Sequence, residues 1–408
     1  VERMFAAKDY FIVQGPPGTG KTSGLLTQYI EKVFRDTEHH ILILSFTNRA
    51  VDEICLNLKK HSIPFIRTGQ SETIKQELLE HLIAEQDFDE IEKIIKSNRI
   101  WVATVQSCNA WLNDMLNIVK IDELVIDEAS QIIENNILGI ITKVGKTILI
   151  GDQNQLPPIT LQTKETFKFQ NQQLKSLSYD YYNKSMMERL FQVCETRGWN
   201  HSITMLNEHY RMHNQIASLV QEYYADALIP KLPLQLQDLV PQGNILVDSR
   251  LVWIEFPVSE HLYYDSLQVQ YIIQILKVFK QYGIVQNYDK DVGIVTPFRA
   301  MIQAIYKELP TDLRAITIDT VERFQGSERK NIIISLPLHH ANDLSLTEAL
   351  SSDGKVDRKL NVAITRAQER LIILGCSKLC QKSRHYNNLL HKIQSSGTMI
   401  NYQELFKL

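Results

Sequence analysis

Residues Gly15–Thr22 constrain the fold of this chain more than any other stretch. They read Gly-Pro-Pro-Gly-Thr-Gly-Lys-Thr and fit the phosphate-binding loop pattern G-x-x-x-x-G-K-[ST] at every position. The apolar run 11–13 before the loop predicts a strand, and residues 23–34 after it predict a helix. Because this pattern binds phosphate only between a strand and a helix, the context predicts an α/β domain that binds a nucleoside triphosphate.

Each part of the loop has a predicted role. Glycines let successive backbone N–H groups turn toward a phosphate, and the following helix presents its positive end to the same anion. Lys21 is expected to reach the β- and γ-phosphates, and the Thr22 hydroxyl is expected to bind Mg²⁺. With ATP and Mg²⁺ as cofactors, the predicted nucleotide-binding residues are Gly15, Pro16, Pro17, Gly18, Thr19, Gly20, Lys21 and Thr22.

Composition sets wide limits on the kind of protein. The chain has 408 residues, of which 44% are hydrophobic and 22% charged, as in ordinary globular proteins of two or three domains. We expect no membrane segment, because no apolar run approaches roughly 18 residues. The five cysteines are scattered, which favours reduced thiols in an intracellular protein. A net charge of −3 gives no global signal for nucleic acid, although a local basic groove stays possible.

Short apolar runs alternate with helical stretches through the first half of the chain. The runs 41–44, 100–103, 124–126 and 147–150 have the length and composition of buried parallel strands. Such alternation predicts a parallel, RecA-like sheet, with ligand-binding groups at the carboxyl ends of its strands. Residues 71–97 contain no glycine or proline and predict a helical insertion in this domain.

An acidic pair follows one of these strands. Asp127 and Glu128 come directly after residues 123–126, which is the Walker B arrangement. We expect Asp127 to hold Mg²⁺, and Glu128 to orient and deprotonate the attacking water. Gln155, in the loop after the next strand, is a neutral donor that could sense a γ-phosphate.

Small polar residues follow two other strands. Thr47 and Asn48 come after the run 41–44, and Thr104 and Gln106 come at the end of the run that starts at residue 100. Such side chains suit contacts with a nucleic-acid backbone, but they equally suit helix caps. A polar excursion at 161–187 leaves a similar choice, because its aromatic residues could stack on bases or pack on the domain. These are Phe167, Phe169, Tyr179, Tyr181 and Tyr182.

Three segments together resemble superfamily 1 helicases. They are the phosphate-binding loop, Asp-Glu-Ala-Ser-Gln at 127–131 and Gly-Asp-x-x-Gln-Leu-Pro-Pro at 151–158. The branch that is most similar contains the up-frameshift RNA helicase and the flap-processing nuclease-helicase of DNA replication. Segments 206–213, 316–328 and 358–367 resemble later motifs in the family's order, so the resemblance covers about residues 10–376.

The resemblance implies roles for residues in the second half. Tyr210 would stack on adenine, and Arg211 and Arg366 would reach the γ-phosphate. Gln325 and Gly326 would lie between nucleotide and nucleic acid, Glu328 would contact the nucleotide sugar and Thr320 the nucleic-acid backbone. Phe298 would contact a base or sugar, although core packing is an equal alternative. The predicted catalytic set is Lys21, Asp127, Glu128, Gln155, Arg211 and Arg366.

The predicted architecture is two tandem RecA-like parallel-sheet domains, 1–200 and 201–408, which share one ATP site. The resemblance implies ATP-driven 5′→3′ movement on single-stranded nucleic acid, with DNA favoured weakly over RNA. The glutamine motif and the β-barrel subdomain of the branch are not in this sequence, and we expect a monomeric core within a larger protein. The alternatives are an RNA helicase of the same branch and a nucleotide-switch ATPase that remodels protein complexes.

Overall fold

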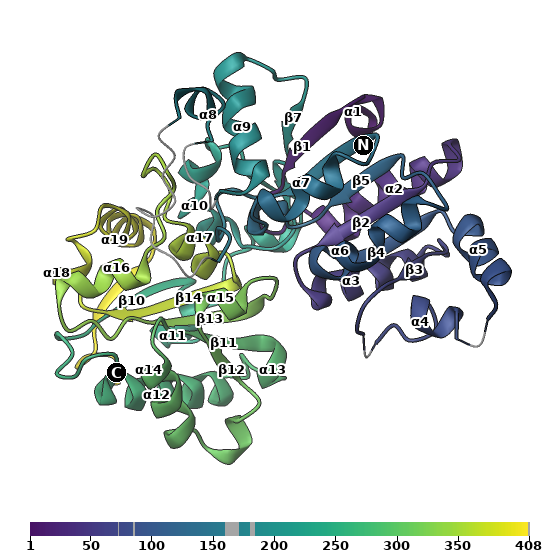
Figure 1. Ribbon diagram of the computed structural model, residues 1–408. Helices are drawn as coiled ribbons and strands as arrows, with labels where there is room; N and C mark the ends of the chain where they lie inside the picture. The colour runs from purple at the N-terminus through teal and green to yellow at the C-terminus, as the bar shows by residue number, and fades with distance from the viewer. Residues whose placement is uncertain (72, 85, 160–170, 180–183, 407–408) are drawn as a thin grey trace. The chain divides into compact units, whose positions relative to one another are not determined.

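A computed structural model describes residues 1–408 except 72, 85, 160–170, 180–183 and 407–408 (Figure 1). The aromatic residues Phe167, Phe169, Tyr181 and Tyr182 of the polar excursion therefore lie outside the described residues. The chain divides into two compact units. The first comprises residues 1–153 and 157–206, and the second comprises residues 154–156 and 207–408.

The first unit contains a seven-stranded parallel sheet with the order β3-β4-β2-β5-β6-β1-β7. Its strands are β1 (Tyr10–Gln14), β2 (Ile41–Ser45), β3 (Ile66–Arg67), β4 (Ile100–Thr104), β5 (Glu123–Ile126), β6 (Lys146–Gly151) and β7 (Ile203–Met205). The last strand, β7, pairs with β1, so this unit extends to residue 206 rather than to the expected residue 200.

Side chains of these strands alternate between two cores, one on each face of the sheet. Ile41 and Ile43 of β2 join the core beneath α2 and α3, whereas Leu42 and Leu44 join the core beneath α6, α7 and α9. The helices are α1 (Glu2–Ala6), α2 (Thr27–Asp36), α3 (Asn48–Lys60), α4 (Leu79–Leu82), α5 (Phe88–Ser97), α6 (Val105–Leu116), α7 (Asn135–Ile141), α8 (Gln172–Ser176) and α9 (Met186–Arg197). A π-helix covers Lys21–Leu26 and a 3-10 helix covers Ala129–Gln131.

The predicted helical insertion is only partly helical. Helices α4 and α5 lie within residues 71–97, but the described residues from 71 to 78 form no helix. Instead Leu78 forms an isolated parallel bridge with Arg67, and the Arg67 N–H donates to the Glu77 carbonyl at 2.8 Å. Pairing with β3 therefore overrides the helical composition of this segment.

The second unit contains a six-stranded parallel sheet with the order β12-β11-β13-β14-β10-β15. Its strands are β10 (Leu251–Glu255), β11 (Val292–Val295), β12 (Thr317–Asp319), β13 (Arg329–Ser335), β14 (Ala367–Gly375) and β15 (Thr398–Asn401). A separate pair is formed by β8 (Glu208–His209) and β9 (Ile229–Pro230). The prediction of two parallel α/β sheets is confirmed.

The helices of the second unit include the long α12, whose apolar residues Val269, Ile272 and Leu276 join one core with α14 and the strands. The helices are α10 (Asn214–Ser218), α11 (Ile245–Asp248), α12 (Ser266–Gln281), α13 (Tyr288–Asp291), α14 (Arg299–Glu308), α15 (Val321–Phe324), α16 (Leu344–Thr347), α17 (Arg358–Ile364), α18 (Ser377–Cys380) and α19 (Arg384–Ser396). The 3-10 helices cover Gln221–Tyr224, Pro233–Leu236, Thr311–Leu313 and Ala341–Asp343. Within the described ranges, no helix is long and apolar enough to cross a membrane.

Candidate nucleotide site and nucleic-acid contacts

The phosphate-binding loop joins β1 to the π-helix, as the strand–loop–helix pattern requires. Gly18 and Gly20 have φ of 77° and 72°, values that favour glycine, and so they let the loop turn back on itself. The Lys21 ammonium donates to the Gly15 carbonyl at 2.7 Å, which holds its side chain across the loop. A Cβ at Gly15 would lie 2.2 Å from Cγ of Lys21, so the path of this side chain requires glycine there.

Thr22 and Asp127 lie together, although 105 positions separate them in the chain. The Thr22 hydroxyl donates to Oδ2 of Asp127 at 2.7 Å, because the carboxyl ends of β1 and β5 lie at the same edge of the parallel sheet. Burial raises the pKa of the Asp127 carboxyl, and the nearby charge of Glu128 raises it further. The Thr22 hydrogen bond and the charge of Lys21 oppose this rise.

These two side chains fit a divalent cation. Both offer hard oxygen donors, which Mg²⁺ prefers, and a cation would stabilise the ionised carboxylate that burial disfavours. Thr22 and Asp127 are therefore the residues that would hold Mg²⁺, where it would neutralise charge on the phosphates.

Glu128 adopts a left-handed backbone conformation, with φ of 54°. Such a conformation is uncommon for a residue other than glycine and is often found at functional sites. Its N–H donates to Oδ1 of Asp127 at 3.0 Å, and its Oε2 accepts a hydrogen bond from the Gln131 amide at 3.0 Å. The strained backbone and the Gln131 contact together set the direction of the Glu128 carboxylate.

The end of β6 supports the loop in a way that the sequence did not predict. The Gly15 N–H donates to the Gly151 carbonyl at 2.8 Å, and the Gln14 amide donates to Oδ1 of Asp152 at 3.3 Å. A Cβ at Gly151 would lie 2.8 Å from the Met187 sulfur, so the close packing here needs glycine. Gly151, the last residue of β6, and Asp152 directly after it thus support the phosphate-binding loop.

In the second unit, two predicted nucleotide residues lie side by side because β13 and β14 pair. Arg366 precedes β14 and Glu328 precedes β13, and the Arg329 N–H donates to the Arg366 carbonyl at 3.0 Å. The Arg366 guanidinium is 2% exposed and donates to the carbonyls of Val362 at 3.0 Å and Ser327 at 3.1 Å. The chain therefore fixes the direction of this arginine on several sides.

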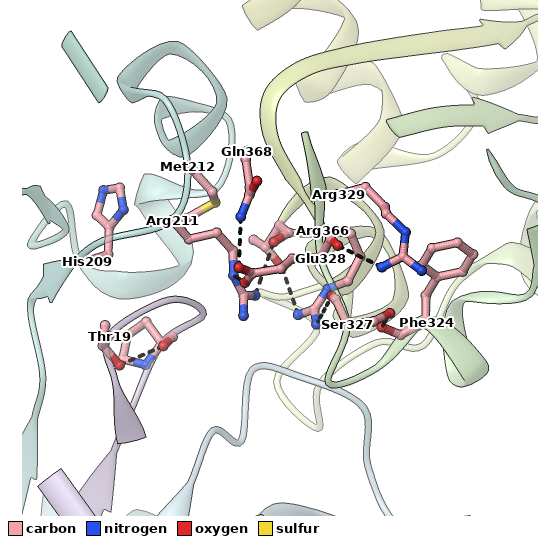
Figure 2. A network of polar contacts seen from close by, with 12 residues as sticks. Thr19, His209, Arg211, Met212, Phe324, Ser327, Glu328, Arg329, Arg366 and Gln368 are labelled. Carbon is pink, nitrogen blue, oxygen red and sulfur yellow. Dashed lines mark hydrogen bonds and ion pairs between the residues drawn. The ribbon is translucent and has the colours of Figure 1, made fainter. Parts of the chain in front are cut away.

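Arg211 forms an ion pair with Glu328, and it also donates to the Thr365 carbonyl at 3.3 Å (Figure 2). The Gln368 amide donates to the other oxygen of the same carboxylate at 2.7 Å. The sequence did not predict this contact between two candidate nucleotide residues, and it did not single out Gln368. Next to Arg211, the Tyr210 ring is 49% exposed, which leaves it available for stacking.

Gln155 belongs to the second unit, although the sequence placed it in the first half of the ATP site. The Asn154 amide donates to the Tyr223 carbonyl at 2.6 Å, and the Asn361 amide donates to the Asn154 carbonyl at 2.7 Å. Gln155 is buried, and its Oε1 lies 3.5 Å from a guanidinium nitrogen of Arg366, at the limit of a hydrogen bond. The structure therefore groups these two predicted γ-phosphate residues.

The loop between α15 and β13 contains an orphaned donor. The Gln325 Nε2 is buried and has no hydrogen-bond partner, and Gly326 has φ of 77°. Because a buried amide without a partner is costly, this group is a candidate for a ligand contact.

The predicted nucleic-acid residues of the first unit include two helix caps. Thr47 accepts from the Ala50 N–H at 3.2 Å at the start of α3, and Thr104 accepts from the Ser107 N–H at 3.1 Å at the start of α6. Both hydroxyl oxygens therefore accept capping hydrogen bonds. Gln106 is exposed on α6.

Asn48 is oriented by a buried arginine that the sequence did not single out. The guanidinium of Arg67 is fully buried, and it donates to Oδ1 of Asn48 at 3.1 Å and Oδ1 of Asp52 at 2.9 Å. It also donates to the carbonyls of Thr68 at 2.6 Å and Gln70 at 2.7 Å. A charged residue directly after the apolar pair 65–66 was the signal available in the sequence.

A groove of about 1040 Å³ lies between the start of α3 and the segment after β3. Asn48, Arg49, Gln70 and Ser71 are among its lining residues. Because Arg67 holds Oδ1 of Asn48, the amide nitrogen of Asn48 is left to donate elsewhere.

In the second unit, the two remaining predicted nucleic-acid residues differ in exposure. Phe298 is 7% exposed and packs in the core, with its ring centroid 4.8 Å from that of Tyr263. The packing alternative therefore accounts for Phe298. Thr320 is partly exposed after β12.

The two parallel sheets and the loop at Gly15–Thr22 define a chain of the P-loop nucleotide-binding class. Residues 1–161 and residues 182–378 match two family models, each described as an AAA domain. Together with the motifs, these matches and the relatives below place the chain in the superfamily 1 helicases. Within this superfamily, the findings support the branch that contains the up-frameshift and replication nuclease-helicases.

Two curated relatives are both named DNA replication ATP-dependent helicase/nuclease DNA2. The Gallus gallus protein is 26% identical over 98% of this chain and 38% of its own length. The Bos taurus protein is 26% identical over 100% of this chain and 40% of its own length. The chain thus spans about two fifths of the length of these relatives. Among solved structures, an arterivirus nonstructural protein 10 (helicase) in complex with DNA is similar over 91% of this chain and 61% of that chain, with 15% identity and a TM-score of 0.45.

Proposed function

We propose that this chain hydrolyses ATP and uses the energy to move along single-stranded nucleic acid and separate strands. The contact between Thr22 and Asp127, beside Lys21 and Glu128, carries the proposal, because it brings to one sheet edge the residues that we propose as metal ligands, phosphate contact and base. Family membership and the names of the DNA2 relatives support the helicase assignment and the weak preference for DNA.

In this proposal, the residues of the first unit carry the chemistry at the triphosphate. Lys21 and the loop amides bind phosphate oxygens, and Thr22 and Asp127 would hold Mg²⁺, which would neutralise phosphate charge. Glu128 accepts the proton of the attacking water, and its left-handed backbone and the Gln131 contact direct the carboxylate.

The residues of the second unit supply the groups that sense the nucleotide. Tyr210 stacks on the adenine and Glu328 contacts the nucleotide sugar, whereas Gln325 and Gly326 lie between the nucleotide and the nucleic acid. Arg211 and Arg366 stabilise charge on the γ-phosphate, and Gln155, beside Arg366, detects its presence.

Movement requires a hold on the nucleic-acid strand that does not depend on base sequence. We propose that Thr47, Asn48, Thr104, Gln106 and Thr320 contact its phosphates and sugars. Such contacts weaken as salt is raised. The direction is proposed as 5′→3′, and Phe298 is left out because it packs in the core.

A Glu128→Gln variant tests the proposal. It should bind ATP within a few-fold of the wild type and lose at least about a hundredfold of kcat, because the amide cannot take a proton. Glu308→Gln, an exposed change on α14, is the matched control. Turnover of Glu128→Gln at the wild-type rate would remove Glu128 from this role.

The substrate is tested by ATP hydrolysis with single-stranded DNA and with RNA of the same sequence, and by strand separation with 5′ and 3′ overhangs. The proposal expects stimulation by DNA and unwinding from a 5′ overhang. Tenfold better stimulation by RNA would reverse the preference, and no stimulation by either would favour an ATPase that remodels protein complexes.

A further inference from the structure

The Glu328 carboxylate lies between two side chains of the second unit (Figure 2). Its Oε2 pairs with Nε of Arg211, and its Oε1 accepts the hydrogen bond from Gln368 at 2.7 Å. The Arg211 side chain is 16% exposed and that of Glu328 is 42% exposed. In the proposed function, Arg211 serves the γ-phosphate and Glu328 the sugar, yet in this structure the two residues bind each other.

Gln368 connects to both partners of this pair. Its side chain fixes Glu328, and its backbone carbonyl accepts from the His213 N–H at 2.7 Å, two positions after Arg211. Gln368 lies on β14, two residues after Arg366. One residue of β14 thus anchors the segment that carries Arg211 and the carboxylate that holds its side chain.

We propose that Gln368 is a positioning residue that holds the Glu328 carboxylate against Arg211, and that a sugar hydroxyl of the nucleotide takes the place of Arg211 at this carboxylate. The proposal rests on the proposed function for the identity of the nucleotide. The contact among Arg211, Glu328 and Gln368 exists without it.

The exchange is chemically balanced, because no covalent bond forms or breaks. A sugar O–H donates to Oε2 in place of the ion pair with the guanidinium, and the freed guanidinium keeps its charge for an anionic phosphate. Glu328 itself has no donor to offer a phosphate when ionised. An ion pair with a half-exposed partner contributes little, corresponding to about twofold to fivefold in an equilibrium, so a ligand can displace it.

The first experiment uses the whole chain with no nucleotide. The ¹⁵N-resolved Nε–H signal of Arg211, assigned by its loss in Arg211→Lys, reports how fast this proton exchanges with water. Glu328→Gln should speed the exchange about fivefold, and Gln368→Met about twofold. Gln303→Met, an exposed change on α14, should leave it unchanged. Equal rates in the wild type and in both test variants would overturn the proposal.

The second experiment adds adenosine or adenine at millimolar concentration to the wild type. Adenosine, which carries the sugar hydroxyls, should speed exchange of the Arg211 Nε–H, and adenine should not. No effect of adenosine, or the same effect of adenine, would overturn the sugar exchange. If both experiments succeed but the chain does not hydrolyse ATP, the proposed function fails and this inference stands. If the chain hydrolyses ATP but the exchange rates in the first experiment are equal, the proposed function stands and this inference fails.

Discussion

Asp357 is a buried carboxylate at the start of α17, the helix that leads to Arg366. Its Oδ1 caps the helix by accepting from the N–H groups of Lys359 at 3.1 Å and Leu360 at 3.3 Å, and it also accepts from the Ala349 N–H at 3.0 Å. Its Oδ2 is buried with no hydrogen-bond partner. We predict that Asp357→Asn keeps the cap and removes the cost of burying a charge.

Burial raises the pKa of Asp357 from 3.8 to about 6, and the nearby Glu348 adds to the rise, which the capping hydrogen bonds and His385 oppose. Between these two pKa values, the unfolded chain has lost the proton while the folded chain still holds it. Stability therefore falls as pH rises through this window, by about 3 kcal/mol in total at about 1.4 kcal/mol per unit. Between pH 4.5 and pH 7.5 the loss is about 2 kcal/mol.

The assay is urea unfolding, read from hydrogen exchange in peptides of β13 and β14, so that the second unit is followed by itself. Relative to the wild type, Asp357→Asn should gain about 2 kcal/mol more stability at pH 7.5 than at pH 4.5. Asp289→Asn, an exposed change in the same unit, is the control and should show no such difference. A gain for Asp357→Asn that is the same at both pH values would refute the burial argument.

Two further substitutions test the first unit. Gly15→Ala places a Cβ 2.2 Å from Cγ of Lys21, so the lysine must leave its position. We expect affinity for a fluorescent ATP analogue to fall at least about tenfold, while the unfolding free energy changes by less than about 1 kcal/mol. Arg67→Met leaves Asp52 without its buried partner. We expect the free energy of unfolding in urea to fall by about 3 kcal/mol and the binding of single-stranded DNA to weaken. Unchanged values of both would remove Arg67 from its positioning role.

In the first unit, the sequence predicted well the candidate site residues that come directly after a strand. A loop after β1 and an acidic pair after β5 must meet, because parallel strands end at one edge of a sheet. Local patterns therefore located Thr22 and Asp127 correctly relative to each other. They failed at 71–78, where pairing with β3 opposes helical composition, and at the boundary, where the short strand β7 pairs with β1.

Residues that act through other residues were not predictable from local patterns. Arg67 contacts residues from 15 to 19 positions away, and Gln368 reaches Glu328 across 40 positions. Neither residue lies in a sequence motif that requires an arginine or a glutamine at that position. An arginine in an apolar stretch could equally have been a surface residue. Their roles follow from how β3 and β14 pair with neighbouring strands, which no single stretch encodes.

The arrangement in the second unit depends on strand register. Arg366 and Glu328 precede β14 and β13, so they lie at the amino edge of their sheet rather than at the carboxyl edge that serves the first unit. The register pairs Arg329 with Ala367 and shifts between Arg329 and Asn331. On β14 the irregularity falls between Ala367 and Arg370, at the position of Gln368. The same sheet edge therefore carries Arg366, the carboxylate of Glu328 that pairs with Arg211, and the amide of Gln368 that holds this carboxylate.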